Sequence, residues 1–181
     1  MARNAGFTLV ELILVLTICS ILVAAAGPSF SQLVSNTRMT SGINSLVYSL
    51  NMARSEAVKR ASRVVACKTQ GSESCTNTGK WSDGWLVFVD TNNNALHDSG
   101  EPRLQVRQAL KGDISLRGNL MVRNYIGYGP DGMARTSGGA FQMGTIVTCD
   151  RRGLDSGKAI VINSAGRIRT VRAVKTSFSS C

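Results

Sequence analysis

The sequence predicts an α+β protein in which a long N-terminal helix is followed by an antiparallel β domain. An apolar stretch over residues 7–27 is long enough to span roughly 30 Å of hydrocarbon as a helix. Beyond it, apolar residues recur every three or four positions to about Ser62, as in an amphipathic helix. From Val64 onward, short β-rich runs alternate with Gly, Asn and Asp. We therefore expect a helix with a transmembrane first half and an amphipathic second half, on which the β domain folds.

Glu11 is the one charged residue in the apolar stretch. A carboxylate in lipid is costly, so it should have a cationic partner and a purpose. The alternative is an ordinary signal anchor that tolerates an acid near the membrane interface.

A short leader, Met1-Ala-Arg-Asn-Ala-Gly6, precedes the helix, and Gly6 is followed at once by Phe-Thr-Leu-Val-Glu11. This order of leader, glycine, aromatic residue and acid resembles the prepilin signature of type IV pilins and type II secretion pseudopilins. The resemblance implies that prepilin peptidase cuts between Gly6 and Phe7 and that Phe7 becomes the N-methylated first residue. In that family the acid pairs with a subunit amino terminus during filament assembly. This supplies the partner that Glu11 needs, because an ion pair keeps both charges in lipid at lower cost.

The helix is expected to continue past Gly27-Pro28 with a kink, because proline removes one backbone donor and clashes with the preceding turn. The charged residues Arg54, Glu56, Lys59 and Arg60 fall outside the apolar stripe. The stripe itself consists of Phe30, Leu33, Val34, Ile43, Leu46, Leu50, Ala53 and Ala57.

Eight short segments have strand character, and turn signals at residues 130–132, 137–139 and 164–166 separate the later ones. The predicted strands are Val64–Lys68, Gly84–Asp90, Arg103–Leu110, Asp113–Arg117, Val122–Tyr128, Ala140–Cys149, Lys158–Asn163 and Arg167–Ala173.

The chain beyond the apolar stretch is long enough for one domain with its own core, the full length being 181 residues. The formal net charge is +10 and is uneven, since residues 111–181 hold 11 Lys or Arg against 4 Asp. Such an excess favours polyanions such as nucleic acid or anionic surfaces, although a basic balance alone also aids solubility.

Four cysteines remain outside the membrane helix, where Cys19 behaves as a small apolar residue. Cys67 with Cys75 and Cys149 with Cys181 are the preferred disulfides by proximity in the sequence, but three pairings are open. Such bonds fit an oxidising compartment. A zinc site is disfavoured, because no C-x2-C pair is present and the chain has one histidine.

No catalytic constellation is found, so we expect a non-enzyme without a cofactor. His97 lies in a polar loop without a recognisable nucleophile. The same loop places oxygen-bearing side chains at positions one, three, five, nine and twelve of a calcium-loop template. However, position six is Ala95 where the template has Gly, which favours a plain connecting loop over calcium. The candidate ligands are Asp90, Asn92, Asn94, Asp98 and Glu101.

The head also carries a resemblance, through Gly84-Trp-Leu-Val-Phe-Val-Asp90, the loop that follows and Gly129-Pro-Asp-Gly132. These segments resemble minor pilins and pseudopilins of the FimT, FimU and GspH kind. The resemblance implies two small antiparallel sheets packed on the helix, and hence a pilin-like fold. The expected domains are a leader (1–6), a transmembrane and assembly segment (7–27), an amphipathic helix (28–62) and a β head (63–181).

The C-terminal run Gly166-Arg-Ile-Arg-Thr-Val-Arg172 places Arg167 and Arg169 on one face of a strand, with Ile168 on the other. Guanidinium groups suit phosphate oxygens, but basic residues also protect exposed edge strands from pairing. A Gly-Arg-x-Arg element at this place is similar to that of FimT-type minor pilins, which bind DNA for uptake. It maps onto Gly166, Arg167 and Arg169. By charge alone, the basic residues that could widen the patch are Arg151, Arg152, Lys158, Arg172 and Lys175.

The resemblance implies a minor type IV pilin, held in the inner membrane with a periplasmic head and then built into a pilus near its tip. Its expected partners are other pilin or pseudopilin subunits, prepilin peptidase, the inner membrane and double-stranded DNA, bound without sequence preference. The alternative is a structural minor pilin for motility or adhesion, or a type II secretion pseudopilin, that primes assembly without binding DNA.

Overall fold

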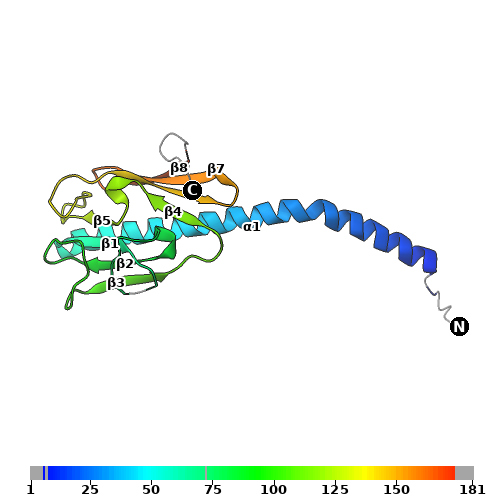
Figure 1. The fold of residues 1–181 in the computed structure, drawn as a ribbon, viewed down its shortest axis with the longest axis horizontal. Coiled ribbons are helices and arrows are strands. Elements are labelled where there is room, and N and C mark those ends of the chain that lie inside the picture. The colour runs from blue at the N-terminus through cyan, green and yellow to red at the C-terminus, as the bar shows by residue number, and fades with distance from the viewer. Residues whose placement is uncertain (1–5, 7, 72, 174–181) are drawn as a thin grey trace. The chain divides into compact units, whose positions relative to one another are not determined.

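The computed structural model describes residue 6 and residues 8–71 and 73–173, without the side chains of residues 25–28. It divides into two compact units, the first ending at Thr37 and the second beginning at Arg38. The helix α1 (Leu9–Arg60) contributes to both (Figure 1). The second unit contains all the described strands and is called the head below.

Helix α1 is continuous through Gly27-Pro28, which confirms that the proline does not end it. The helix ends two residues before the predicted Ser62. Ala61 takes a left-handed φ of 48°, the Ser62 N–H donates to the Ala57 carbonyl at 3.2 Å, and the Ala61 N–H donates to the Val58 carbonyl at 3.3 Å. This pair of bonds is a Schellman motif, which turns the chain out of the helix and into the first strand.

The buried stripe of α1 begins later than predicted. Phe30 and Leu33 are 68% and 61% exposed, because they precede Arg38, where the head begins. Within the head the prediction is confirmed and gains Met39. The hydrophobic helix residues with at most 1% exposure are Met39, Ile43, Leu46, Leu50, Ala53 and Ala57.

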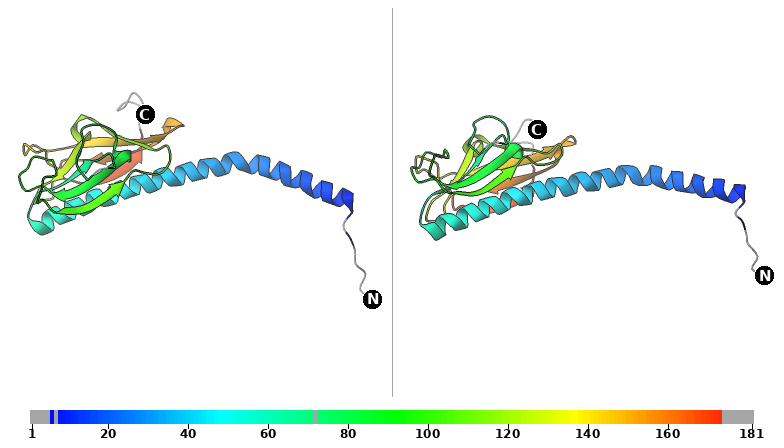
Figure 2. Two further views of the ribbon diagram at one scale, coloured as in Figure 1. Left: turned by 60° about the horizontal axis from the view of Figure 1, so that its bottom comes forward. Right: turned by 90° about the horizontal axis from the view of Figure 1, so that it is seen from below.

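The described strands form two four-stranded antiparallel sheets, as the resemblance implied. The first has the order β3-β2-β1-β5 and the second the order β4-β6-β7-β8. In Figure 2 both sheets lie over the part of α1 that belongs to the head. The first sheet consists of β1 (Val64–Lys68), β2 (Gly84–Val89), β3 (Arg103–Gln108) and β5 (Tyr125–Tyr128). The second consists of β4 (Ser115–Gly118), β6 (Gly144–Asp150), β7 (Gly153–Ile162) and β8 (Ile168–Arg172).

Three segments differ from the sequence prediction by three residues or more. Strand β6 begins at Gly144, four residues later than predicted. Strand β7 begins at Gly153, earlier than predicted, because residues 153–157 extend the hairpin with β6 and Gly153 pairs with Asp150. The start of the predicted strand at Val122 is instead a short 3-10 turn, Leu120–Val122. Its carbonyl at Val122 accepts a hydrogen bond of 2.9 Å from the buried indole of Trp81.

The head has a hydrophobic core of its own. The larger cluster joins the buried stripe of α1 to one face of each sheet, and Trp81 and Trp85 are its largest side chains. A smaller cluster, around Val65, Leu86 and Phe88, covers the opposite face of the first sheet. Because every member of both clusters lies at Met39 or beyond, the head contains what it needs to fold without the first unit.

Candidate functional site

The predicted DNA-binding arginines lie on the hairpin that joins β7 to β8. Its turn is closed by a hydrogen bond of 2.9 Å from the Gly166 N–H to the Asn163 carbonyl. The Asn163 side chain accepts a second, from the Arg167 N–H at 2.9 Å, and the backbone pairing resumes between Asn163 and Arg167. The turn therefore fixes the backbone on both sides of Gly166.

Strand β8 is an edge strand whose register separates the arginines by face. Ile168 pairs with Ile162 and packs against the core, whereas Arg169 pairs with Val161 and is exposed. Arg167 is also exposed and shares the alternation of Arg169. Arg172 has the alternation of Ile168, so it lies on the other face of the strand. The described hairpin thus brings together Arg167 and Arg169 but not Arg172, and Lys175 lies outside the described residues.

Gly166 is buried and serves the backbone of the hairpin. Its φ is +73°, a left-handed conformation that favours glycine. A Cβ at this position would overlap the carbonyl oxygen of Gly132, which belongs to the turn Gly129–Gly132. The sequence motif groups Gly166 with the binding residues; in the structure this glycine permits close packing of two turns and is not an exposed contact.

Arg54 of α1 adds to the site a residue that the sequence motif does not include. Its Nε donates to the Gly132 carbonyl and its Nη2 to the Ala165 carbonyl, each at 2.9 Å. The helical wheel indicates that Arg54 lies off the apolar stripe, and it is indeed half-buried at the border of the core. No signal in the sequence connects it to two turns so distant along the chain.

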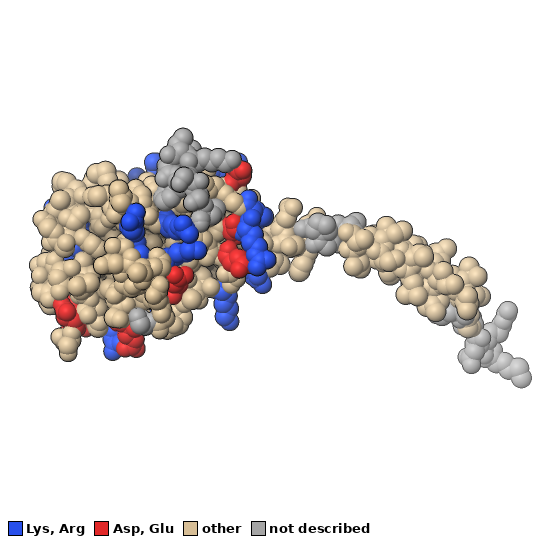
Figure 3. Space-filling model, viewed as in Figure 1, with Lys and Arg blue, Asp and Glu red and all other residues tan. Residues whose placement is uncertain are grey.

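The basic residues of the β6–β7 hairpin do not extend this site. Strand β7 belongs to both hairpins and separates their turns, since its ten residues span about 33 Å. Arg151 pairs with Asp113 at 2.6 Å, and Arg152 pairs with Asp150 at 2.6 Å. The hydrogen bond from Arg152 lowers the pKa of the Asp150 carboxyl. Figure 3 shows acidic groups beside several basic groups on the face it displays. Lys158 is engaged as well, donating to Thr40 Oγ1 at 2.9 Å.

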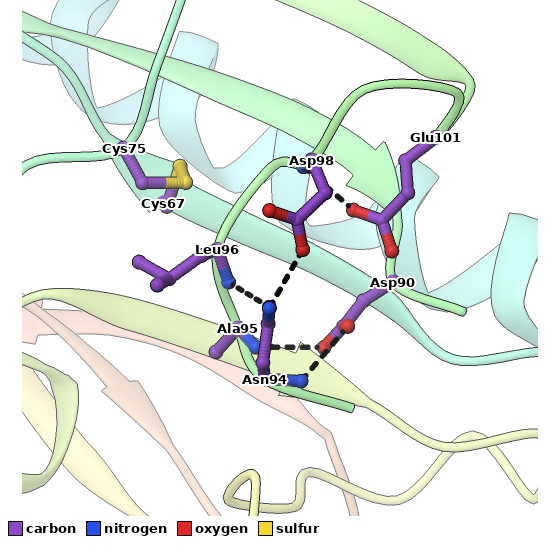
Figure 4. The surroundings of a disulfide bond; sticks show 8 residues. All are labelled: Cys67, Cys75, Asp90, Asn94, Ala95, Leu96, Asp98 and Glu101. Atoms are coloured by element: carbon purple, nitrogen blue, oxygen red, sulfur yellow. Dashed lines mark hydrogen bonds between the residues drawn. A yellow bond between two sulfur atoms is a disulfide. The ribbon is translucent and has the colours of Figure 1, made fainter. Parts of the chain in front are cut away.

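The carboxylates of the Asp90 loop bind the loop itself (Figure 4). Asp90 accepts bonds of 3.1 Å from the N–H groups of Asn94 and Ala95, and Glu101 accepts from the N–H groups of Thr91 and Asp98. Asp98 accepts from the amide groups of Asn92 and Asn94, which lower the pKa of its carboxyl. The oxygens are therefore directed at donors around the loop and not at one common point.

This geometry favours the connecting loop over the calcium loop. Asp90 is fully buried in an ion pair with Arg63, whose Nε lies 2.8 Å from Oδ2, and a cation placed there would face this guanidinium. Asn93 and Ala95 adopt positive φ values of 62° and 60°, so the turn forms with Ala at template position six. Within the described residues, no group of three or more His, Cys, Asp or Glu is arranged to hold a metal ion.

His97 takes part in the packing of the same loop. Its ring meets Phe88 edge-on, with centroids 5.3 Å apart, and its Nε2 lies 3.1 Å from the Glu101 carbonyl oxygen. These contacts give His97 a structural role in holding the loop against the sheet.

The Cys67–Cys75 disulfide is present as predicted (Figure 4). It links Cys67 of β1 to Cys75 in the polar segment that follows the strand. The adjacent Lys68 is buried and donates to the carbonyls of Asn77 and Gly79, and its desolvation lowers the pKa of its ammonium group. Cys149 is buried on β6. Its predicted partner Cys181 lies outside the described residues, so the second bridge stays a prediction.

The N-terminal signature is described in part. Helix α1 is long and apolar enough to cross a membrane, by length and composition. Near its start, Glu11 accepts hydrogen bonds from the N–H and hydroxyl of Thr8 at 2.8 and 3.0 Å. The predicted cleavage site is described at Gly6, while Phe7 lies outside the described residues.

A membrane-type helix joined to an antiparallel head of two sheets defines a pilin-like subunit. Residues 1–27 match the prokaryotic N-terminal methylation motif, and residues 42–166 match the family described as type II transport protein GspH. The chain belongs to this GspH family. It is therefore a minor pilin or pseudopilin of a type IV pilus or a type II secretion system, a class that associates with other such subunits and is processed by prepilin peptidase.

Two solved structures share the fold, both of the type IV minor pilin FimU from Pseudomonas aeruginosa strain PAO1. The first matches with a TM-score of 0.58 and 19% identity over 77% of this chain and 92% of FimU. The second, from another crystal form, has a TM-score of 0.54 and 19% identity over 73% and 91% of the two chains. No curated protein is found to match the sequence. The likeness to FimU confirms the predicted fold class and, at this identity, concerns the fold alone.

Proposed function

We propose that the protein is a minor type IV pilin whose head binds double-stranded DNA through Arg167 and Arg169, for uptake in natural transformation. The observation that carries the proposal is the placement of these two side chains. Both are exposed on one side of a hairpin with a fixed backbone. Among the ion pairs formed by the described residues, neither arginine takes part, in contrast to Arg151 and Arg152.

The chemistry expected at this site is the recognition of phosphate. Exposed guanidinium groups hold phosphate oxygens with paired hydrogen bonds, and such contacts read the DNA backbone and not its bases. Binding should therefore be independent of sequence and should weaken steeply as salt increases. No aromatic side chain lies within β8, so stacking on single-stranded bases does not contribute from this strand.

The remaining steps of the proposal concern the first unit. Prepilin peptidase would cut after Gly6 and the amino group of Phe7 would be methylated. The subunit would wait in the inner membrane with its head in the periplasm and then enter the pilus at or near its tip. Mass spectrometry of the mature protein should find N-methylated Phe7, and an intact Met1 would contradict this processing.

The test of DNA binding is fluorescence anisotropy of a labelled duplex titrated with the head, from about Ser35 onward, at low and moderate salt. The variant Arg167→Ala/Arg169→Ala should lose salt-sensitive binding. The matched control, Arg151→Ala/Arg152→Ala, removes the same charge at the other hairpin and should retain it. Equal losses of DNA binding in both variants would mean that binding depends on the net charge of the head and not on the position of the arginines. If the wild-type head does not bind DNA, the proposal is refuted.

A structural role without DNA binding is the second candidate, favoured by the family match over residues 42–166 to a type II transport protein. In this case the subunit would prime a pilus for motility or adhesion, or a secretion pseudopilus. Deletion of the protein should then abolish filament assembly or protein secretion, and full-length Arg167→Ala/Arg169→Ala should restore it.

A further inference from the structure

The turn of the β7–β8 hairpin is tied to helix α1 by the guanidinium group of Arg54. Arg54 Nε donates to the carbonyl of Gly132, and Arg54 Nη2 donates to the carbonyl of Ala165, each over 2.9 Å. These carbonyls belong to two different turns, and Ala165 is only two residues from Arg167. A planar guanidinium has donors at fixed spacing, so it also sets the distance between the two turns.

The two turns touch each other beside Arg54. Gly166 lies against the Gly132 carbonyl, and the Ala134 N–H donates to the Ser164 carbonyl at 3.1 Å. The Gly132 carbonyl is thus contacted by the helix on one side and by the arginine-bearing hairpin on the other. Without the guanidinium, the hydrogen bonds described above between the two turns would be those of the backbone.

We propose that Arg54 is a positioning residue for the Arg167 and Arg169 site: it holds the β7–β8 hairpin on helix α1 without touching the ligand. This inference rests on the proposed function. The two acceptors of Arg54 described above are backbone carbonyls, so the guanidinium connects the two turns through two separate hydrogen bonds. Because carbonyls are neutral, they do not neutralise its charge.

Three variants of the head distinguish the effect of the two Arg54 hydrogen bonds from the effect of its positive charge. Arg54→Met removes both hydrogen bonds and one charge. Arg60→Met is the matched control, because Arg60 lies on the same helix, is exposed and pairs locally with Glu56. Arg54→Lys keeps the charge and most of the side-chain packing but lacks the planar guanidinium that reaches both carbonyls. It therefore serves as the test variant if Arg54→Met does not fold.

The first measurement is amide hydrogen exchange. In Arg54→Met the amides of Gly166 and Ala134 should exchange about tenfold faster or more, since two hydrogen bonds that anchor their turns are lost. Arg54→Lys should show a smaller increase and Arg60→Met none, while the amides of β1 stay unchanged in all three. Unchanged exchange at Gly166 in Arg54→Met would overturn the proposal.

The second measurement is a double-mutant cycle in DNA affinity. Arg54→Met should weaken binding by roughly threefold to tenfold, but by less than about twofold when Arg167→Ala/Arg169→Ala is already present. Equal losses in both backgrounds would overturn the proposal and make Arg54 a phosphate contact of its own. If the wild-type head does not bind DNA, the proposed function is refuted. The hydrogen-exchange measurement then still tests separately whether Arg54 fixes the hairpin.

Discussion

The turn of the β7–β8 hairpin depends on glycine at position 166. Gly166 has both a left-handed φ and no room for a Cβ, which is a stronger requirement than either condition alone. Gly139 provides a natural comparison, since its φ of +84° is similar but no atom lies within 4 Å of the place that a Cβ would take. The two positions therefore separate backbone strain from steric contact.

We predict that Gly166→Ala destabilises the head by about 2–4 kcal/mol, the sum of left-handed strain and overlap with the Gly132 carbonyl. Gly139→Ala should cost about 1–2 kcal/mol, from strain alone. Urea denaturation of the two variants beside the wild-type head measures the difference. Equal losses in the free energy of unfolding would mean that the Gly132 turn moves to admit the methyl group. The close packing of the two turns would then not contribute to stability.

The Arg63–Asp90 pair offers a second test at the residue scale. Asp90→Ala should destabilise the head by about 3–5 kcal/mol, because it leaves the buried guanidinium unpaired. Asp131→Ala, which breaks the more exposed pair with Arg135, should cost about 1 kcal/mol or less. The measurement is again the free energy of unfolding in urea. A small loss for Asp90→Ala would show that water reaches Arg63 when its partner is removed.

Elements were more predictable from the sequence than their packing. The eight strands of the described residues and the continuation of the helix follow from local patterns of apolar residues, glycine and asparagine. The apolar pattern could not show where burial of α1 begins, since Phe30 and Leu33 follow the same spacing as Ile43 and Leu46. Strand alternation places Arg167 and Arg169 on one face, and their assignment to DNA rests on the resemblance to FimT-type minor pilins. Arg54 was not predicted, because its two partners are carbonyls of remote turns.

This difference along α1 predicts unequal effects of the same substitution. Leu46→Ala should destabilise the head by about 2–5 kcal/mol, as expected for a fully buried leucine. Leu33→Ala should change the free energy of unfolding by less than about 0.5 kcal/mol, because its side chain is 61% exposed. Thermal or urea unfolding of a head that starts before Leu33 tests both. A large loss at Leu33 would place the start of the packed helix earlier than Arg38.

At the scale of the whole molecule, the two units carry different chemistry. In the first unit the described helix exposes large apolar side chains between Leu9 and Val23 and holds Glu11, whereas both hydrophobic clusters and the arginine hairpin belong to the head. Assembly and ligand binding should therefore be separable by substitution. Pairing of Glu11 with a subunit amino terminus, as the family resemblance implies, is the proposed role of the first unit, and DNA binding through Arg167 and Arg169 is that of the head.

We predict that Glu11→Gln abolishes entry of the full-length chain into filaments, because the neutral amide cannot neutralise a neighbouring amino terminus in lipid. Its head should keep the wild-type DNA affinity, since Glu11 lies in the first unit. Conversely, full-length Arg167→Ala/Arg169→Ala should enter filaments normally and fail in DNA uptake. Immunoblots of sheared filaments measure the first property and transformation frequency the second. Loss of filament entry in the arginine variant would contradict the division, because it would make the β7–β8 hairpin part of the subunit contact.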